Sequence, residues 1–126
     1  MKIILDTNFL LLPAQFKIDI FEELKEFSQH IFTFDVCIDE LEGIAKSGGR
    51  KSVQARVALD LLKKKRIKII KTGEKNADIA ILKYVKTIKK DGDLSVATND
   101  RKLIKTLKNN GINIIRLRQK KYLVSE

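Results

Sequence analysis

Short apolar segments alternate with amphipathic segments along the whole chain, and this alternation limits its fold more than any other feature. Residues rich in β-branched and aromatic side chains, predicted as strands, cover positions 3–5, 31–36, 67–70, 94–97 and 112–117. Apolar residues at helical spacing, predicted as helices, cover positions 18–29, 38–46, 53–65, 76–89 and 100–110. The pattern predicts an α/β fold of three layers, with a central parallel sheet of about five strands and helices on both faces.

The length of 126 residues suits one domain, which we expect to span positions 1–126. A single cysteine, Cys37, excludes an internal disulfide and fits a reducing compartment. No apolar segment approaches the ~18 residues of a membrane span, and Met1 leads directly into the first strand, so we expect neither a membrane partner nor a signal peptide. The expected location is therefore cytoplasmic. Positions 116–122 are expected to form a basic tail after the last strand.

The net charge of +10 is placed unevenly along the chain. Positions 1–62 hold 7 basic and 10 acidic side chains, whereas positions 63–126 hold 19 basic and 6 acidic ones. One interpretation is that lysine-rich helix faces keep a thermophilic protein in solution. The other is a polyanionic partner, because clustered cations gain free energy when they release counterions from phosphates.

Four acids are expected at one edge of the predicted sheet, because the carboxyl ends of parallel strands share an edge. Asp6 directly follows the first strand, Asp100 follows the fourth by two residues, and Glu40 and Asp78 lie near the starts of the helices after the second and third. Considered by itself, each acid also has a purely structural explanation. Asp78 and Asp100 could cap a helix or interact with its dipole, Glu40 could be an exposed helix acid, and Asp6 could form a turn. Four like charges at one edge nevertheless favour a bound cation.

The chemistry of this edge points to a hard cation. Carboxylates without a cluster of histidine or cysteine suit Mg²⁺ or Mn²⁺, and the one histidine, His30, lies away from the acids and is expected to be structural. The sequence contains no HExxH or CxxC motif and no phosphate-binding glycine loop. A receiver domain is excluded because no aspartate ends the third predicted strand.

The segments that carry these acids resemble, in order, the motifs of the PIN-domain ribonucleases. They are Leu5-Asp6-Thr7-Asn8, Asp39-Glu40-Leu41-Glu42, Ala77-Asp78-Ile79-Ala80 and Thr98-Asn99-Asp100-Arg101. Positions 6–9, 14–19 and 115–122 further resemble the archaeal relatives of the eukaryotic pre-ribosomal-RNA endonucleases, and VapC toxins share the acid pattern. One departure is that Ile79 follows Asp78 where many members carry a second acid, which puts a second metal ion in doubt.

The resemblance implies a metal-dependent endoribonuclease that hydrolyses RNA phosphodiester bonds and leaves a 5′-phosphate. Asp6, Asp78 and Asp100 are expected to hold Mg²⁺ or Mn²⁺, partly through water, and Glu40 to complete the site or orient the attacking water. The polar neighbours expected to fix these carboxylates are Thr7, Asn8, Thr98 and Asn99. The cations expected to contact RNA are Arg50, Lys51, Arg101, Arg118, Lys120 and Lys121.

Three alternatives concern the biological role. The chain is an RNA- or ribosome-binding scaffold that does not cut, a processing enzyme acting on ribosomal RNA, or a toxin held by a cognate antitoxin. Intact acids argue against the scaffold, because a pure RNA binder gains nothing from a negative pocket. Apolar residues at positions 10–12, expected to be exposed, are a candidate surface for a homodimer.

Overall fold

The computed structural model describes residues 1–87 and 93–126 and places six strands in one sheet. Their spatial order is β3-β2-β1-β4-β5-β6, and all neighbouring pairs are parallel except β5 with β6. The strands are β1 (Lys2–Leu5), β2 (His30–Phe34), β3 (Lys68–Ile70), β4 (Leu94–Ala97), β5 (Asn113–Arg118) and β6 (Tyr122–Ser125). The chain order reverses between β1 and β4, and open α/β sheets place their ligand sites at such a point.

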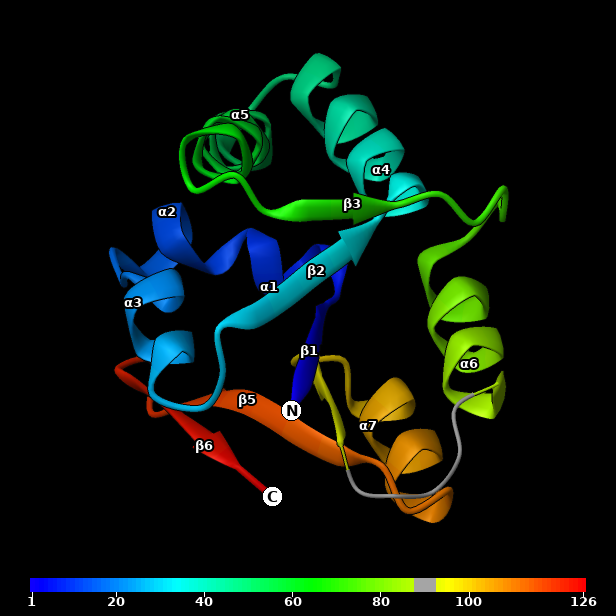
Figure 1. Cartoon of the computed structure of the whole chain (residues 1–126). Helices are drawn as coiled ribbons and strands as arrows, with labels where there is room; N and C mark the ends of the chain where they lie inside the picture. The colour runs from blue at the N-terminus through cyan, green and yellow to red at the C-terminus, as the bar shows by residue number, and fades with distance from the viewer. Residues whose placement is uncertain (88–92) are drawn as a thin grey trace.

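Seven helices lie in the described parts of the chain and surround this sheet (Figure 1). They are α1 (Thr7–Leu10), α2 (Leu12–Phe16), α3 (Ile20–Lys25), α4 (Asp35–Lys46), α5 (Arg50–Lys64), α6 (Ala77–Thr87) and α7 (Arg101–Asn109). The α/β fold with helices on both faces is therefore confirmed. No helix in residues 1–87 or 93–126 is long and apolar enough to cross a membrane.

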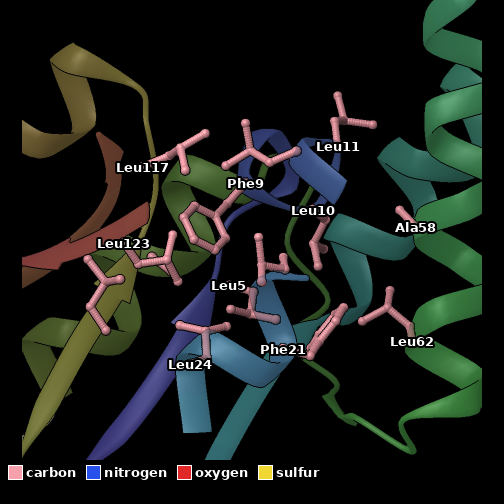
Figure 2. Close-up of a cluster of buried hydrophobic side chains, with 14 of the residues drawn as sticks. Leu5, Phe9, Leu10, Leu11, Phe21, Leu24, Ala58, Leu62, Leu117 and Leu123 are labelled. Carbon is pink, nitrogen blue, oxygen red and sulfur yellow. The ribbon is translucent and has the colours of Figure 1, made fainter. Parts of the chain in front are cut away.

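The sheet separates two groups of buried apolar side chains, because successive residues of a strand point to opposite faces. In β1, Ile3 and Leu5 pack with α1–α3 and α5, whereas Ile4 packs with α6 and α7. Figure 2 shows the first group, in which side chains from α1, α3 and α5 meet those of β5 and β6 around Leu5. All three apolar residues of β1 are fully buried, as the uninterrupted apolar run predicts.

The expectation that positions 10–12 form an exposed surface for a homodimer is wrong. Leu10, Leu11 and Leu12 are 1%, 5% and 4% exposed and belong to the first apolar group. Leu10 ends α1, Leu11 connects the two helices and Leu12 begins α2, and Pro13 is tolerated at the second position of α2 because its missing N–H costs no helical hydrogen bond there.

The expectation of a basic tail is also wrong. Residues up to Arg118 continue β5, and Gln119 and Lys120, both with positive φ, form a turn into β6. The pairing of Arg116 with Val124 and of Arg118 with Tyr122 makes this an antiparallel hairpin at the edge of the sheet. The run of cations from Arg116 to Lys121 concealed β6, because it separates the short strand Tyr122–Ser125 from the apolar part of β5.

Some helix bounds also differ from expectation. α3 spans only Ile20–Lys25, and α4 begins at Asp35, three residues before the predicted start, so Glu40 lies in its second turn. The predicted end of α6 near Lys89 lies outside the described residues, as do Asp91 and Gly92, a residue pair typical of turns.

Candidate active site

The register of β1 with β4 brings Asp6 next to Thr98. Leu5 pairs with Ala97, and the N–H of Asp6 continues the ladder by donating to the Ala97 carbonyl at 3.0 Å. The hydroxyl of Thr98 then donates to Oδ2 of Asp6 at 2.7 Å, and the N–H of Thr7 donates to Oδ1 at 2.8 Å. Both carboxylate oxygens of Asp6 are therefore fixed at the carboxyl ends of the two central strands.

The carboxyl of Asp6 is 2% exposed, and its environment opposes ionisation. Burial, with smaller contributions from the charges of Asp78 and Asp100, raises the pKa of Asp6 from its ordinary 3.8 to about 6, against the lowering effect of the hydrogen bonds from Thr98 and Thr7. An acid that is buried near two other acids is a typical feature of a functional site.

Glu40 connects three helices at this edge. Its Oε1 accepts a 2.7 Å hydrogen bond from the hydroxyl of Thr7 in α1, and its Oε2 accepts a 3.0 Å bond from the N–H of Ala77 at the start of α6. Glu40 is half-buried, and both of its carboxylate oxygens are held by residues of this edge, which argues against its being an ordinary exposed helix acid. It also fixes the position of α6, the helix that carries Asp78.

Asp78 and Asp100 occupy different positions at the starts of their helices. Asn76, not Asp78, caps α6 through its Oδ1, which accepts from the N–H groups of Asp78 and Ile79. Asp100 does cap α7, because its Oδ1 accepts from the N–H groups of Lys102 and Leu103. Capping therefore accounts for one oxygen of Asp100 and for none of Asp78.

Each of the four acids lies close enough to at least one other for their negative charges to repel. Burial raises the pKa of Asp78, and the charges of Asp100 and Glu40 raise it further. Among the described residues, none of these carboxylates forms an ion pair with a lysine or arginine. In the same part of the chain, no three acid, histidine or cysteine side chains lie close enough together to hold a metal ion by direct contacts alone. The donor set fits a hydrated Mg²⁺ or Mn²⁺, which keeps several water ligands.

The sequence analysis missed Asp35, which also follows a strand directly. Its Oδ1 accepts from the N–H of Val36, and from both the N–H and the hydroxyl of Thr72 at 3.0 and 2.9 Å. Its Oδ2 accepts from the N–H of Gly73, and these donors, the N–H of Thr72 first, lower the pKa of Asp35. Asp35 therefore ties the loop before α6 to β2. The signal was present, since Phe34-Asp35 repeats the apolar-to-acid step of Leu5-Asp6.

The buried Cys37 and Thr33 lie beneath this edge. The Thr33 hydroxyl donates to the Leu5 carbonyl at 2.8 Å, and Sγ of Cys37 lies 3.9 Å from the same oxygen. Burial raises the pKa of the Cys37 thiol, so it stays protonated and packs as a small apolar group. These two side chains fix the end of β1, where Asp6 begins.

The expected polar neighbours of the acids separate into two groups. Thr7 and Thr98 contact Glu40 and Asp6, as described above. Asn8 is exposed, and in the described residues it makes no side-chain hydrogen bond to an acid. The amide oxygen of Asn99 accepts instead from the N–H of Leu117, which ties the loop before α7 to β5. The roles expected for these two asparagines remain predictions.

The cations expected to contact RNA are all exposed. Arg50 and Lys51 begin α5, Arg101 begins α7 beside Asp100, and Arg118 ends β5. The remaining two, Lys120 and Lys121, lie in the hairpin turn. Nζ of Lys120 lies 5.6 Å from the ring centre of Phe16, a cation–π contact that gives this lysine a structural role as well.

Comparison with known proteins identifies the family. A family model described as "PIN like domain" matches residues 3–120. The chain belongs to the PIN-like domain family. It is 35% identical over 125 residues to "Ribonuclease VapC4" of Methanocaldococcus jannaschii, and the alignment covers 96% of this chain and 93% of that protein. This PIN-like chain is therefore homologous to a ribonuclease, as the four motifs predict.

Solved structures show the same PIN fold. The structure of the PIN domain endonuclease Utp24 superposes with a TM-score of 0.79 at 27% identity, covering 99% of this chain and 90% of that one. A domain of a functionally unknown protein from M. jannaschii superposes with a TM-score of 0.61 at 19% identity, covering 93% and 91% of the two chains. The second comparison supports the fold alone.

Proposed function

We propose that this chain is a metal-dependent endoribonuclease, with its centre at the edge where β1 and β4 end. The observation that carries the proposal is Asp6, a buried carboxylate whose two oxygens are held by Thr98 and Thr7, and which no lysine or arginine of residues 1–87 and 93–126 pairs with although other acids lie near it. Burying such a charge is unfavourable unless a cation balances it. The names of the VapC4 and Utp24 relatives support nuclease chemistry.

Asp6, Asp78 and Asp100 would hold Mg²⁺ or Mn²⁺, with water completing the coordination. The cation, when bound, lowers the pKa of water and offsets charge that develops on the phosphate. Thr98 and Thr7 orient the Asp6 carboxylate, and Thr7 also orients Glu40. Glu40 would accept a proton from the attacking water, because it is fixed between α1 and α6 next to Asp78.

RNA cleavage in the presence of Mn²⁺ tests this proposal. Asp6→Asn and Asp100→Asn should each abolish cutting, because each removes a negatively charged ligand. Asp39→Asn is the matched control: it makes the same change at an exposed acid of α4, one residue from Glu40, and should cut like the parent. Unchanged cutting by the Asp6→Asn variant would contradict the assignment of this site as the nuclease centre. If the parent neither cuts RNA nor binds Mn²⁺ in calorimetry, the chain is a scaffold.

The role in the cell follows from the RNA that is cut. The motif resemblance to pre-ribosomal-RNA endonucleases and to VapC toxins leaves two candidate roles, maturation of ribosomal RNA and a toxin released from an antitoxin. Mapping 5′-phosphate ends across the transcriptome after induction separates them, because processing gives ends at one or a few positions in precursor ribosomal RNA. A toxin gives ends in other RNAs, and growth recovers when a small protein encoded next to it is co-expressed.

A further inference from the structure

Three cations on α7 form a line that leads away from the acid site. Arg101, Lys105 and Lys108 are spaced i, i+4 and i+7, so they share one face of the helix, and all three are exposed. The line begins directly after Asp100 and extends over about 10 Å, at 1.5 Å per residue. A row of cations of this length can contact successive phosphates of one strand.

These cations border a hollow of about 660 Å³ between α7 and the end of the hairpin. Ile104 and Leu117 supply its apolar lining, and Arg116 of β5 adds a fourth cation. Asn99 lies at the end of the hollow nearest to Asp100, with its amide oxygen held by Leu117. The hollow is therefore open and positively charged, and the two residues that flank Asp100 in the sequence, Asn99 and Arg101, line it.

A carboxylate occupies the other end of this hollow. Oε1 of Glu126 accepts a 3.4 Å hydrogen bond from Nζ of Lys108 and a second bond from Nε of Arg116. One oxygen shared by a lysine and an arginine is the arrangement that these side chains also give to a phosphate oxygen. The backbone of Glu126 is fixed independently, by a pair of hydrogen bonds with Ile114 at 2.7 and 2.8 Å.

We propose that the hollow beside α7 binds the backbone of single-stranded RNA, and that Glu126 is an internal competitor for its phosphates. In the bound state, phosphates contact Arg101, Lys105 and Lys108, and the RNA displaces the Glu126 carboxylate from Lys108 and Arg116. The inference rests on the proposed function, because the cations Arg101, Lys105 and Lys108, which we call the α7 track, direct the RNA strand to the acids. It assigns no base specificity, since phosphate contacts position a strand without reading its sequence.

Binding of a fluorescein-labelled single-stranded RNA of about 12 nucleotides, followed by anisotropy in EDTA, tests the track without cleavage. Lys105→Ala/Lys108→Ala should weaken binding roughly tenfold at low salt and reduce the slope of log K against log salt by about 1.4, or 0.7 for each lost phosphate contact. Lys64→Ala/Lys65→Ala removes the same charge from the end of α5 and is the matched control. Equal losses in the two double variants would overturn the proposal.

Glu126→Gln tests the competitor from the opposite direction. It removes the negative charge and leaves the backbone pairing with Ile114 in place, so RNA should bind roughly threefold more tightly and with a steeper salt dependence. Unchanged or weaker binding would show that Glu126 does not compete. Thermal unfolding should be nearly the same for all variants, because exposed ion pairs contribute little stability.

Cleavage with Mn²⁺ separates this inference from the proposed function. If the parent cuts RNA and the Lys105→Ala/Lys108→Ala variant cuts with an unchanged KM, the track is wrong and the nuclease assignment stands. If the parent does not cut but binds RNA through α7, the track stands and the nuclease assignment fails. A raised KM with little change in kcat supports both.

Discussion

Thr98 donates a 2.7 Å hydrogen bond to Asp6, although 92 positions separate the two residues in the sequence. The same Thr98 hydroxyl accepts a 3.1 Å bond from the N–H of Asp100. One fully buried hydroxyl therefore connects two of the proposed metal ligands, and it sets the distance between the end of β1 and the start of α7. The site depends on this hydroxyl as much as on the acids.

Replacing that hydroxyl should weaken both folding and metal binding. Thr98→Val keeps the size and the β-branch but leaves Oδ2 of Asp6 and the N–H of Asp100 without a partner, which costs about 1–3 kcal/mol of the free energy of unfolding. Mn²⁺ affinity by calorimetry should fall roughly 10–100-fold. Thr98→Ser restores the hydroxyl and should recover most of the affinity. Wild-type affinity in the valine variant would contradict this role.

Asp6→Asn should stabilise the metal-free protein at neutral pH. The pKa of Asp6 is about 6 in the folded state against 3.8 in the unfolded chain, so the folded state holds a proton that the unfolded state releases. Stability therefore falls as pH rises from about 4 to about 6, by up to about 3 kcal/mol. The asparagine variant avoids this loss.

Urea unfolding in EDTA at pH 4 and pH 7 tests the sign of this effect. The free energy of unfolding of the Asp6→Asn variant should exceed that of the parent at pH 7 and nearly equal it at pH 4. The Asp39→Asn variant should have the same value as the parent at both pH values. A difference that is the same at the two pH values would show that ionisation of Asp6 is not its cause. A stabilised but inactive variant is the result expected of an active-site charge.

Asp35 should control the loop before α6. Asp35→Ala removes the acceptor for the N–H groups of Thr72 and Gly73, so the exchange of these two amides with deuterium should become faster while exchange in β1 is unchanged. Cleavage should decrease as well, because the loop positions the helix of Asp78. Asp35→Asn keeps one oxygen and should recover part of the protection. Equal exchange in parent and alanine variant would exclude this anchoring.

Asp35 contributes to the stability of the folded state, and the pH dependence of its contribution has the opposite sign to that of Asp6. Its pKa is lowered in the folded state, so its contribution is present above the ordinary carboxyl pKa and is lost as pH falls through the lower folded-state value. Protection of the Thr72 amide should therefore be complete at neutral pH and decline in strong acid. An Asp35→Ala variant should show no such decline.

Addition of Mn²⁺ should raise the melting temperature of the parent. At 100 times its dissociation constant, an ion that binds only the folded state adds about 2.7 kcal/mol to the free energy of unfolding. Because the ion also balances the repulsion among the acids, the Asp6→Asn variant should show little of this increase. An equal increase in both proteins would place the ion elsewhere.

The sequence predicted the acid edge because it depends on topology alone. An apolar run such as Ile3-Ile4-Leu5 indicates a strand buried on both faces, and parallel strands bring their carboxyl ends together whatever the details of packing. The residue that ends such a strand, Asp6, was therefore identified correctly as lying at this edge beside Thr98.

Features that depend on contacts between distant elements were not predictable in the same way. The bond from Ala77 to Glu40 requires α6 to begin beside α4, and the bond from Leu117 to Asn99 requires the turn before α7 to reach β5. The strand β6 was missed because a four-residue edge strand lacks a clear apolar period when cations precede it. Burial of Leu10 likewise follows from how α1 packs on the sheet.

The strand order has a consequence for synthesis of the protein. β1 lies between β2 and β4, so the partner on one side of Asp6 is made from residues more than 90 positions later in the chain. Contacts between such distant segments form late in folding because of the entropy lost in closing the loop. The segment around Thr98 must therefore leave the ribosome before the acids can assemble, so the proposed metal site forms late in synthesis of the chain.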